Sequence, residues 1–127
     1  MAIVIDPEVS SLQLVGRFSS KVIRSLRLSI EPCDIFISGE GIEHIRTKHP
    51  KIFREHLQDI PIIISEPEYI GYDPTQHSIE YVKFKDLLLI VPVRPSSGNI
   101  YYVRSLYELS RENMEAYMRK GQLLPYV

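Results

Sequence analysis

Two adjacent segments of the chain carry patterns that the centre of a β-sheet satisfies best. Residues 78–84 alternate along the chain as a strand does when its two faces meet different surroundings. One face would hold Ile79, Tyr81 and Lys83, and the other Glu80, Val82 and Phe84. Residues 87–93 are nearly all apolar, which is typical of a central strand buried on both faces. Pro92 cannot donate a backbone hydrogen bond, so it indicates a bulge or the edge of the pairing.

Further short strands are expected on both sides of this pair. Residues 95–99, with Pro, Ser, Gly and Asn, predict a hairpin loop after which residues 100–107 pair back. Residues 69–72 form a strand that ends at the turn signal Asp73-Pro74. Two more short strands are expected at residues 12–18 and 34–38.

Helical spacing of apolar residues predicts the remaining elements, at residues 21–27, 39–49, 51–58, 60–65 and 111–120. Ser19 or Ser20 would cap the first helix and Ser110 the last, with Gly121 ending it. In the last helix we expect Met114, Tyr117 and Met118 to face inward. The fold class is therefore α+β, with N-terminal helices packed on a four-stranded antiparallel sheet and a C-terminal helix.

Length and composition favour one ordinary globular domain. The chain has 127 residues, of which 44% are hydrophobic and 24% charged. We expect a single domain over residues 1–127, with a lead-in strand and helix at 1–33 and the core at 34–120. One cysteine excludes a disulfide scaffold, and no apolar run is long enough to span a bilayer. These features predict a cytoplasmic protein without membrane contact.

The net charge of −1 disfavours a protein that coats nucleic acid non-specifically. Its distribution is uneven, because residues 41–56 and 81–104 are basic whereas residues 57–80 hold five acids and no Lys or Arg. If the two basic stretches meet in space, they suit a small anionic site such as one phosphodiester. The alternative is a solvated surface of mixed charge.

The densest polar cluster is at residues 44–49. His44 and Lys48 are four apart and share a helix face, whereas His44 and His49 are five apart. Zinc-binding helices place their histidines four apart, so this spacing disfavours a metal site. Pro50 ends the helix after His49 or opens the next helix at its first turn. The His49 imidazole can turn toward the sheet or simply interact with the helix dipole.

A second cluster lies at residues 101–107. In a regular strand Tyr102, Arg104 and Leu106 share one face, and Tyr101, Val103, Ser105 and Tyr107 the other. The guanidinium of Arg104 can bind a phosphate bidentately or pair with an acid such as Glu80 or Glu108. The tyrosines can stack bases, or pack as ordinary strand aromatics.

The order of these segments along the chain is informative. It runs through residues 15–17 (VGR), 34–38 (DIFIS), 44–50 (HIRTKHP), 66–71 (EPEYIG), 78–83 (SIEYVK) and 102–107 (YVRSLY). This series resembles the phage-associated branch of the Barnase–EndoU–colicin–RelE-like (BECR) nucleases, over roughly residues 14–120. The histidine helix of that family matches at His44 and His49, and its Arg-Ser/Thr strand end matches at Arg104 and Ser105.

The resemblance implies a toxin-like endoribonuclease of phage or mobile elements that needs neither metal nor cofactor. It implies RNA, transfer RNA included, as the substrate and a cognate inhibitor protein as a candidate partner. The 2′-OH of RNA would attack the phosphate and leave a 2′,3′-cyclic phosphate and a 5′-OH.

Each site residue has an expected role in that reaction. His44 or His49 would move the protons, Arg104 with Lys48 would hold the phosphate, and Ser105 would donate a hydrogen bond to it. Tyr81 or Tyr107 would stack a base. Arg46 and Lys83 would add cationic contacts to the substrate.

Three alternatives to an active, metal-independent ribonuclease are compatible with the sequence. The chain can be an inactive RNA- or protein-binding module on the same fold, with the acidic residues 57–80 as its working surface. It can be a metal-dependent hydrolase that uses His44, His49 and His77 with an acid. It can also be a degenerate nuclease that keeps the fold without the activity.

Overall fold

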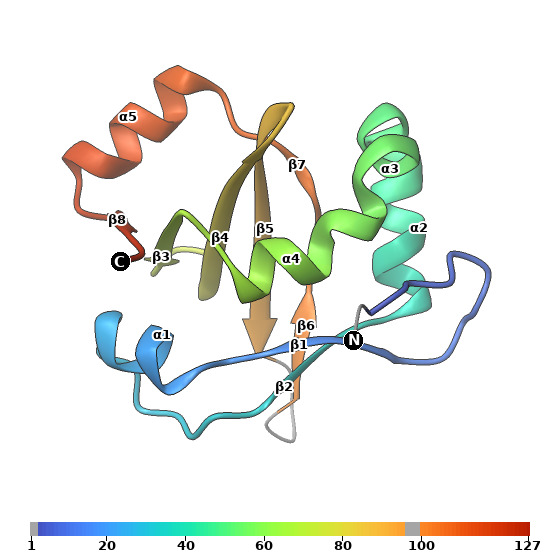
Figure 1. The fold of residues 1–127 in the computed structure, drawn as a ribbon, viewed down its shortest axis with the longest axis horizontal. Coiled ribbons are helices and arrows are strands. Elements are labelled where there is room, and N and C mark those ends of the chain that lie inside the picture. Colours follow the sequence, from blue (N-terminus) through green and yellow to red (C-terminus); the bar gives the residue numbers. More distant parts are fainter. Residues whose placement is uncertain (1–2, 96–99) are drawn as a thin grey trace.

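The computed structural model describes residues 3–95 and 100–127. These residues form eight strands, five α-helices and one 3-10 helix (Figure 1). The strands are β1 (Gln13–Arg17), β2 (Asp34–Ile37), β3 (Tyr69–Asp73), β4 (Ser78–Lys85), β5 (Leu87–Pro95), β6 (Tyr101–Val103), β7 (Tyr107–Glu108) and β8 (Leu123–Pro125). The helices are α1 (Ser20–Ser25), α2 (Gly39–Lys48), α3 (Pro50–His56), η1 (Leu57–Asp59), α4 (Ile60–Ser65) and α5 (Arg111–Arg119). The expected hairpin loop lies, apart from Pro95, outside the described residues.

The α+β class is confirmed, but the expected four-stranded antiparallel sheet is wrong. All eight strands belong to one sheet in the order β1-β2-β6-β5-β4-β3-β8, with β7 paired to β5. The sheet is mixed, because β2 and β6 run parallel. β8 has only three residues and includes a proline, so no period-two pattern in the sequence announces it.

The central pair β4 and β5 forms as its sequence pattern predicts. The two strands are antiparallel from Ile79 opposite Val93 to Lys85 opposite Leu87. Asp86 joins them with a φ of 66°, in the left-handed region that tight turns use. β5 is also paired on its other side, by β6 and β7, which explains its apolar sequence.

One face of this sheet is covered by α4. Ile60, Ile63 and Ile64 of this helix belong to the main hydrophobic core together with Tyr81 of β4. A Cβ at Gly16 would lie 2.7 Å from Ile64 Cγ2, so glycine lets α4 lie directly on β1. The helices α2 and α3 stand beside the sheet (Figure 1), and α2 reaches the main core through Ile42 and Ile45, so the expected packing of N-terminal helices on the sheet is met only in part.

The opposite face is covered only in part, by α5. Ser110 caps this helix by accepting a hydrogen bond from the Asn113 backbone, and Gly121 follows it with a φ of 72°, as the sequence predicts. Met114 and Tyr117 pack on the sheet, but Met118 is 39% exposed and corrects the third inward position. The part of this face that α5 does not cover carries polar residues.

Candidate active site

A polar floor lies on the part of the sheet that α5 leaves uncovered. Glu80 and Arg94 alternate with Tyr81 and Val93, which point to the α4 side. Five residues make this floor at neighbouring positions of three strands: Asp73, Ser78, Glu80, Pro92 and Arg94. Further along the same face, Val82 and Ile90 are buried under α5.

A β-bulge brings Arg104, Ser105 and Tyr107 to this floor. β5 pairs Val93 with Val103 and Ile90 with Tyr107, so the chain after β6 holds one residue more than the strand opposite. The expected regular alternation over residues 101–107 is therefore wrong: Leu106 joins the main core with Val103, and Tyr107 joins the α5 side. Pro92 lies at this interruption, where its carbonyl accepts a hydrogen bond from the Arg104 backbone at 2.8 Å.

The junction of α2 and α3 supplies two histidines. Pro50 begins α3, and the residue before a proline is disfavoured in the helical region, so His49 leaves the helix with φ −137° and ψ 62°. The His49 ring then stacks on the Tyr107 ring, with centroids 5.5 Å apart and planes inclined by 26°. His44 lies edge-on to His49 at 6.4 Å.

These elements enclose one cavity of about 460 Å³. The five residues His44, His49, Arg104, Ser105 and Tyr107, singled out from the sequence, all line it. They come from segments of the chain some sixty residues apart, α2 and the bulge after β6.

The surroundings of His49 favour its neutral form. Partial burial lowers its pKa, and the positive charges of His44 and Lys48 lower it further. A neutral imidazole near neutral pH can accept a proton.

Glu80 is the most unusual carboxyl group of the cavity. Burial raises its pKa and Asp73 adds to this effect, while a hydrogen bond from Ser78 opposes it. Ser78 Oγ donates to Glu80 Oε1 at 2.9 Å, whereas Oε2 is buried with no partner among the described residues. Burial of Tyr107 and the charge of Glu80 raise the pKa of Tyr107 to about 12. The same two causes raise the pKa of Tyr117.

Two polar groups at the bulge are free to meet a ligand. Ser105 is 5% exposed, yet its hydroxyl has no hydrogen-bond partner among the described residues. The exposed Arg104 guanidinium has no ion pair with any described residue. Arg94, in contrast, donates to the Gln76 carbonyl at 2.9 Å and so holds the β3–β4 turn.

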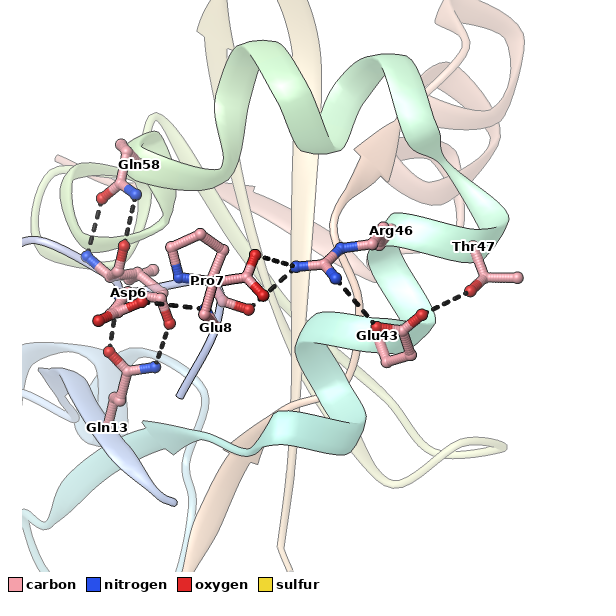
Figure 2. Close-up of polar contacts among 9 residues, drawn as sticks. Asp6, Pro7, Glu8, Gln13, Glu43, Arg46, Thr47 and Gln58 are labelled. Carbon is pink, nitrogen blue, oxygen red and sulfur yellow. Dashed lines mark hydrogen bonds and ion pairs between the residues drawn. The ribbon is translucent and has the colours of Figure 1, made fainter. Parts of the chain in front are cut away.

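Arg46 lies away from the cavity. Its guanidinium donates to the Pro7 carbonyl at 3.0 Å and pairs with Glu8 at 3.3 Å and Glu43 at 3.4 Å (Figure 2). It also lies over the Phe53 ring at 4.8 Å. The expected substrate contact is corrected, because Arg46 fastens the N-terminal segment to α2.

Three further expected site residues do not line the cavity. Tyr81 is fully buried in the core on the α4 face, so of the two tyrosines expected to stack a base, Tyr81 is the wrong choice. Lys83 shares that face and donates to the Glu66 carbonyl at 2.8 Å, so it is also misplaced as a substrate contact. Lys48 is exposed at the end of α2, and its charge lowers the pKa of His49.

The sequence did not single out the floor of the cavity. In addition to the expected residues, the cavity is lined by the five floor residues and by two more: Asp73, Ser78, Glu80, Pro92 and Arg94, with Gln76 and Tyr117. One signal was present: Glu80 shares a strand face with apolar Val82, and an acid on a face that is otherwise buried needs a reason.

Residues 3–95 and 100–127 contain no ligand set for the alternative of a metal-dependent hydrolase. No three His, Cys, Asp or Glu side chains in these ranges are grouped to hold a metal ion. The histidine that this alternative did not include, His56, is buried, and its Nδ1 pairs with Asp59 Oδ2 at 2.8 Å. In the same ranges, no helix has the length and apolar character to cross a bilayer.

Comparison with known proteins gives a family match over most of the chain. The model of a family described as phage-Barnase-EndoU-ColicinE5/D-RelE like nuclease 3 matches residues 13–116, well over half of the chain. Neither a curated protein nor a solved structure matches the chain.

Proposed function

Because the chain belongs to the phage-Barnase-EndoU-ColicinE5/D-RelE like nuclease family, we propose that it is a metal-independent endoribonuclease. The observation that carries this proposal is the meeting of His49, Arg104 and Ser105 in one cavity. A histidine can accept the proton of the 2′-OH, and an unpaired cation with an unpartnered hydroxyl can stabilise the charge on the phosphate, which are two of the tasks in cleavage by the RNA's own 2′-OH.

Each group has a part in the reaction. Burial and the neighbours His44 and Lys48 lower the pKa of His49, which takes the proton from the attacking 2′-OH. Arg104 binds the scissile phosphate, and the Ser105 hydroxyl donates to a non-bridging oxygen whose charge grows in the transition state. His44 lies edge-on to His49 and lines the same cavity. The products are a 2′,3′-cyclic phosphate and a 5′-OH.

Tyr107 is the residue that we propose to stack a base. Its ring is half-buried and lies against His49, so a base placed on it brings the adjacent phosphodiester to the imidazole. A cytoplasmic, toxin-like role with transfer RNA as substrate and an inhibitor protein as partner completes the proposal.

The test is cleavage of total RNA and transfer RNA in EDTA, with chemical analysis of the fragment ends. Wild-type protein should leave cyclic-phosphate ends, and His49→Ala and Arg104→Ala should reduce cleavage by about 10²-fold or more. His77→Asn, at a φ of 53° that asparagine tolerates, and Arg54→Ala are the controls, because both residues are exposed and neither lines the cavity.

Two results would reject the proposal. Intact RNA that stays bound to the wild-type protein would favour the inactive binding module. Cleavage that persists in both His49→Ala and Arg104→Ala would place the chemistry elsewhere.

A further inference from the structure

The proposed cleavage moves two protons, one off the 2′-OH and one onto the departing 5′-oxygen, and His49 accounts for only the first. We propose that Glu80 is the second proton-transfer group, the general acid that protonates the 5′-oxygen. This inference rests on the proposed function and names a catalytic residue that the histidine and arginine motifs do not contain.

The position of Glu80 supports this role. It lies in the middle of β4 on the floor of the cavity, where the strand pairing with β3 and β5 fixes its backbone. Ser78 holds one carboxyl oxygen at 2.9 Å, and the other oxygen is buried with no partner among the described residues. A carboxyl group held by one oxygen keeps the second available for a substrate atom.

Other acidic groups of the cavity are less suitable. Asp73 Oδ1 already accepts hydrogen bonds from the backbones of Thr75 and Gln76, at 2.9 and 3.2 Å, and so shapes the turn. The pKa of Tyr107, about 12, means that its phenol releases a proton too reluctantly. Among these groups Glu80 combines burial with a free oxygen.

Burial and the charges around the two groups shift their pKa values in opposite directions. Glu80 faces Asp73 and the phenols of Tyr107 and Tyr117, with Arg94 and Arg104 on the same lining, and burial raises its pKa. His49 has His44 and Lys48 as its charged neighbours, and they lower its pKa. The pKa of Glu80 is thus shifted upward and that of His49 downward, which are the directions that an acid and a base need.

The step balances with these two groups alone. The 2′-oxygen forms a bond to phosphorus while His49 takes the 2′-OH proton. The bond between phosphorus and the 5′-oxygen breaks while Glu80 gives its proton to that oxygen. His49 is then protonated and Glu80 ionised, and exchange with water restores both.

A substrate with a good leaving group tests this assignment, because such a group departs without an acid. The variants Glu80→Gln and His49→Ala are compared on RNA and on the four nucleoside 3′-(4-nitrophenyl) phosphates. Glu80→Gln should lose about 10²- to 10⁴-fold on RNA but stay within about 10-fold of wild type on the aryl esters. His49→Ala should lose activity on both substrates. Glu66→Gln, an exposed acid beyond the end of α4, is the control.

The possible outcomes separate this inference from the proposed function. If wild-type protein cuts RNA and Glu80→Gln cuts it as well as Glu66→Gln does, Glu80 is not the acid although the protein is a ribonuclease. Equal losses of Glu80→Gln on RNA and aryl esters also overturn the assignment. If wild-type protein cuts neither substrate, the proposed function fails and the inference fails with it.

Discussion

The pKa of a single residue, His49, depends on its burial and on two neighbours, His44 and Lys48, that can be changed one at a time. Lys48 is exposed and lowers the pKa of His49 through its charge alone. We predict that Lys48→Gln raises the pKa of His49 toward the ordinary value of about 6.5. A histidine NMR titration of the free protein measures this shift, with Lys51→Gln as the control. An unchanged titration of His49 in Lys48→Gln would contradict the arrangement.

A second residue, Tyr81, tests the division between core and site. Its hydroxyl is buried with no partner among the described residues, and burial strongly raises its pKa. We predict that Tyr81→Phe leaves RNA cleavage unchanged and raises the free energy of unfolding by about 1 kcal/mol, because an unsatisfied hydroxyl is removed. Urea denaturation and the cleavage assay check both parts. A loss of stability would show that the hydroxyl has a partner.

For single residues, the sequence predicts which residue types form the site better than it predicts which way their side chains point. The motifs at residues 44–50 and 102–107 place His44, His49, Arg104 and Ser105 at the cavity. Alternation along β4 correctly separates Tyr81 from Glu80, but it does not tell which face stays open. That choice depends on where α4 and α5 pack, which is set by contacts far apart in the chain.

At the scale of elements, β8 depends on one glycine. Gly71 of β3 pairs with Leu123 of β8, and a Cβ there would lie 1.7 Å from the Gln122 backbone oxygen. We predict that Gly71→Ala lowers the free energy of unfolding by about 1–3 kcal/mol, because the two strands must separate. Gly121→Asn, at a φ of 72° that asparagine tolerates, should cost much less. Equal stability of Gly71→Ala and wild type in urea would contradict the close approach.

The elements that the sequence predicts are those formed by local contacts. The caps at Ser110 and Gly121 and the hairpin of β4 and β5 are encoded within a few residues. The parallel pairing of β2 with β6 joins segments more than sixty residues apart, so no local pattern announces it. The bulge after β6 adds a single residue, which leaves the composition of the strand unchanged while redirecting Leu106 and Tyr107.

For the whole molecule, the raised pKa of Glu80 links the cavity to folding stability. A carboxyl group whose pKa is higher in the folded state than in the unfolded state binds more protons when folded. Its contribution to stability is therefore greatest at low pH and declines as the pH rises from the ordinary value of 4.5 through the raised pKa of the folded state. Loss of the Glu80 proton in the cavity thus opposes folding.

We therefore predict that Glu80→Gln is more stable than wild type at pH 7.5. The difference between their free energies of unfolding should grow as the pH rises from 4.5 and level off above the pKa of folded Glu80. Chemical denaturation of both proteins between pH 4 and 8 measures it, and Glu66→Gln controls for the loss of an exposed carboxylate. A difference that stays constant over this range would show that the cavity does not hold the pKa of Glu80 above its ordinary value. A variant that gains stability while losing RNA cleavage would show that the fold retains a costly buried acid for its chemistry.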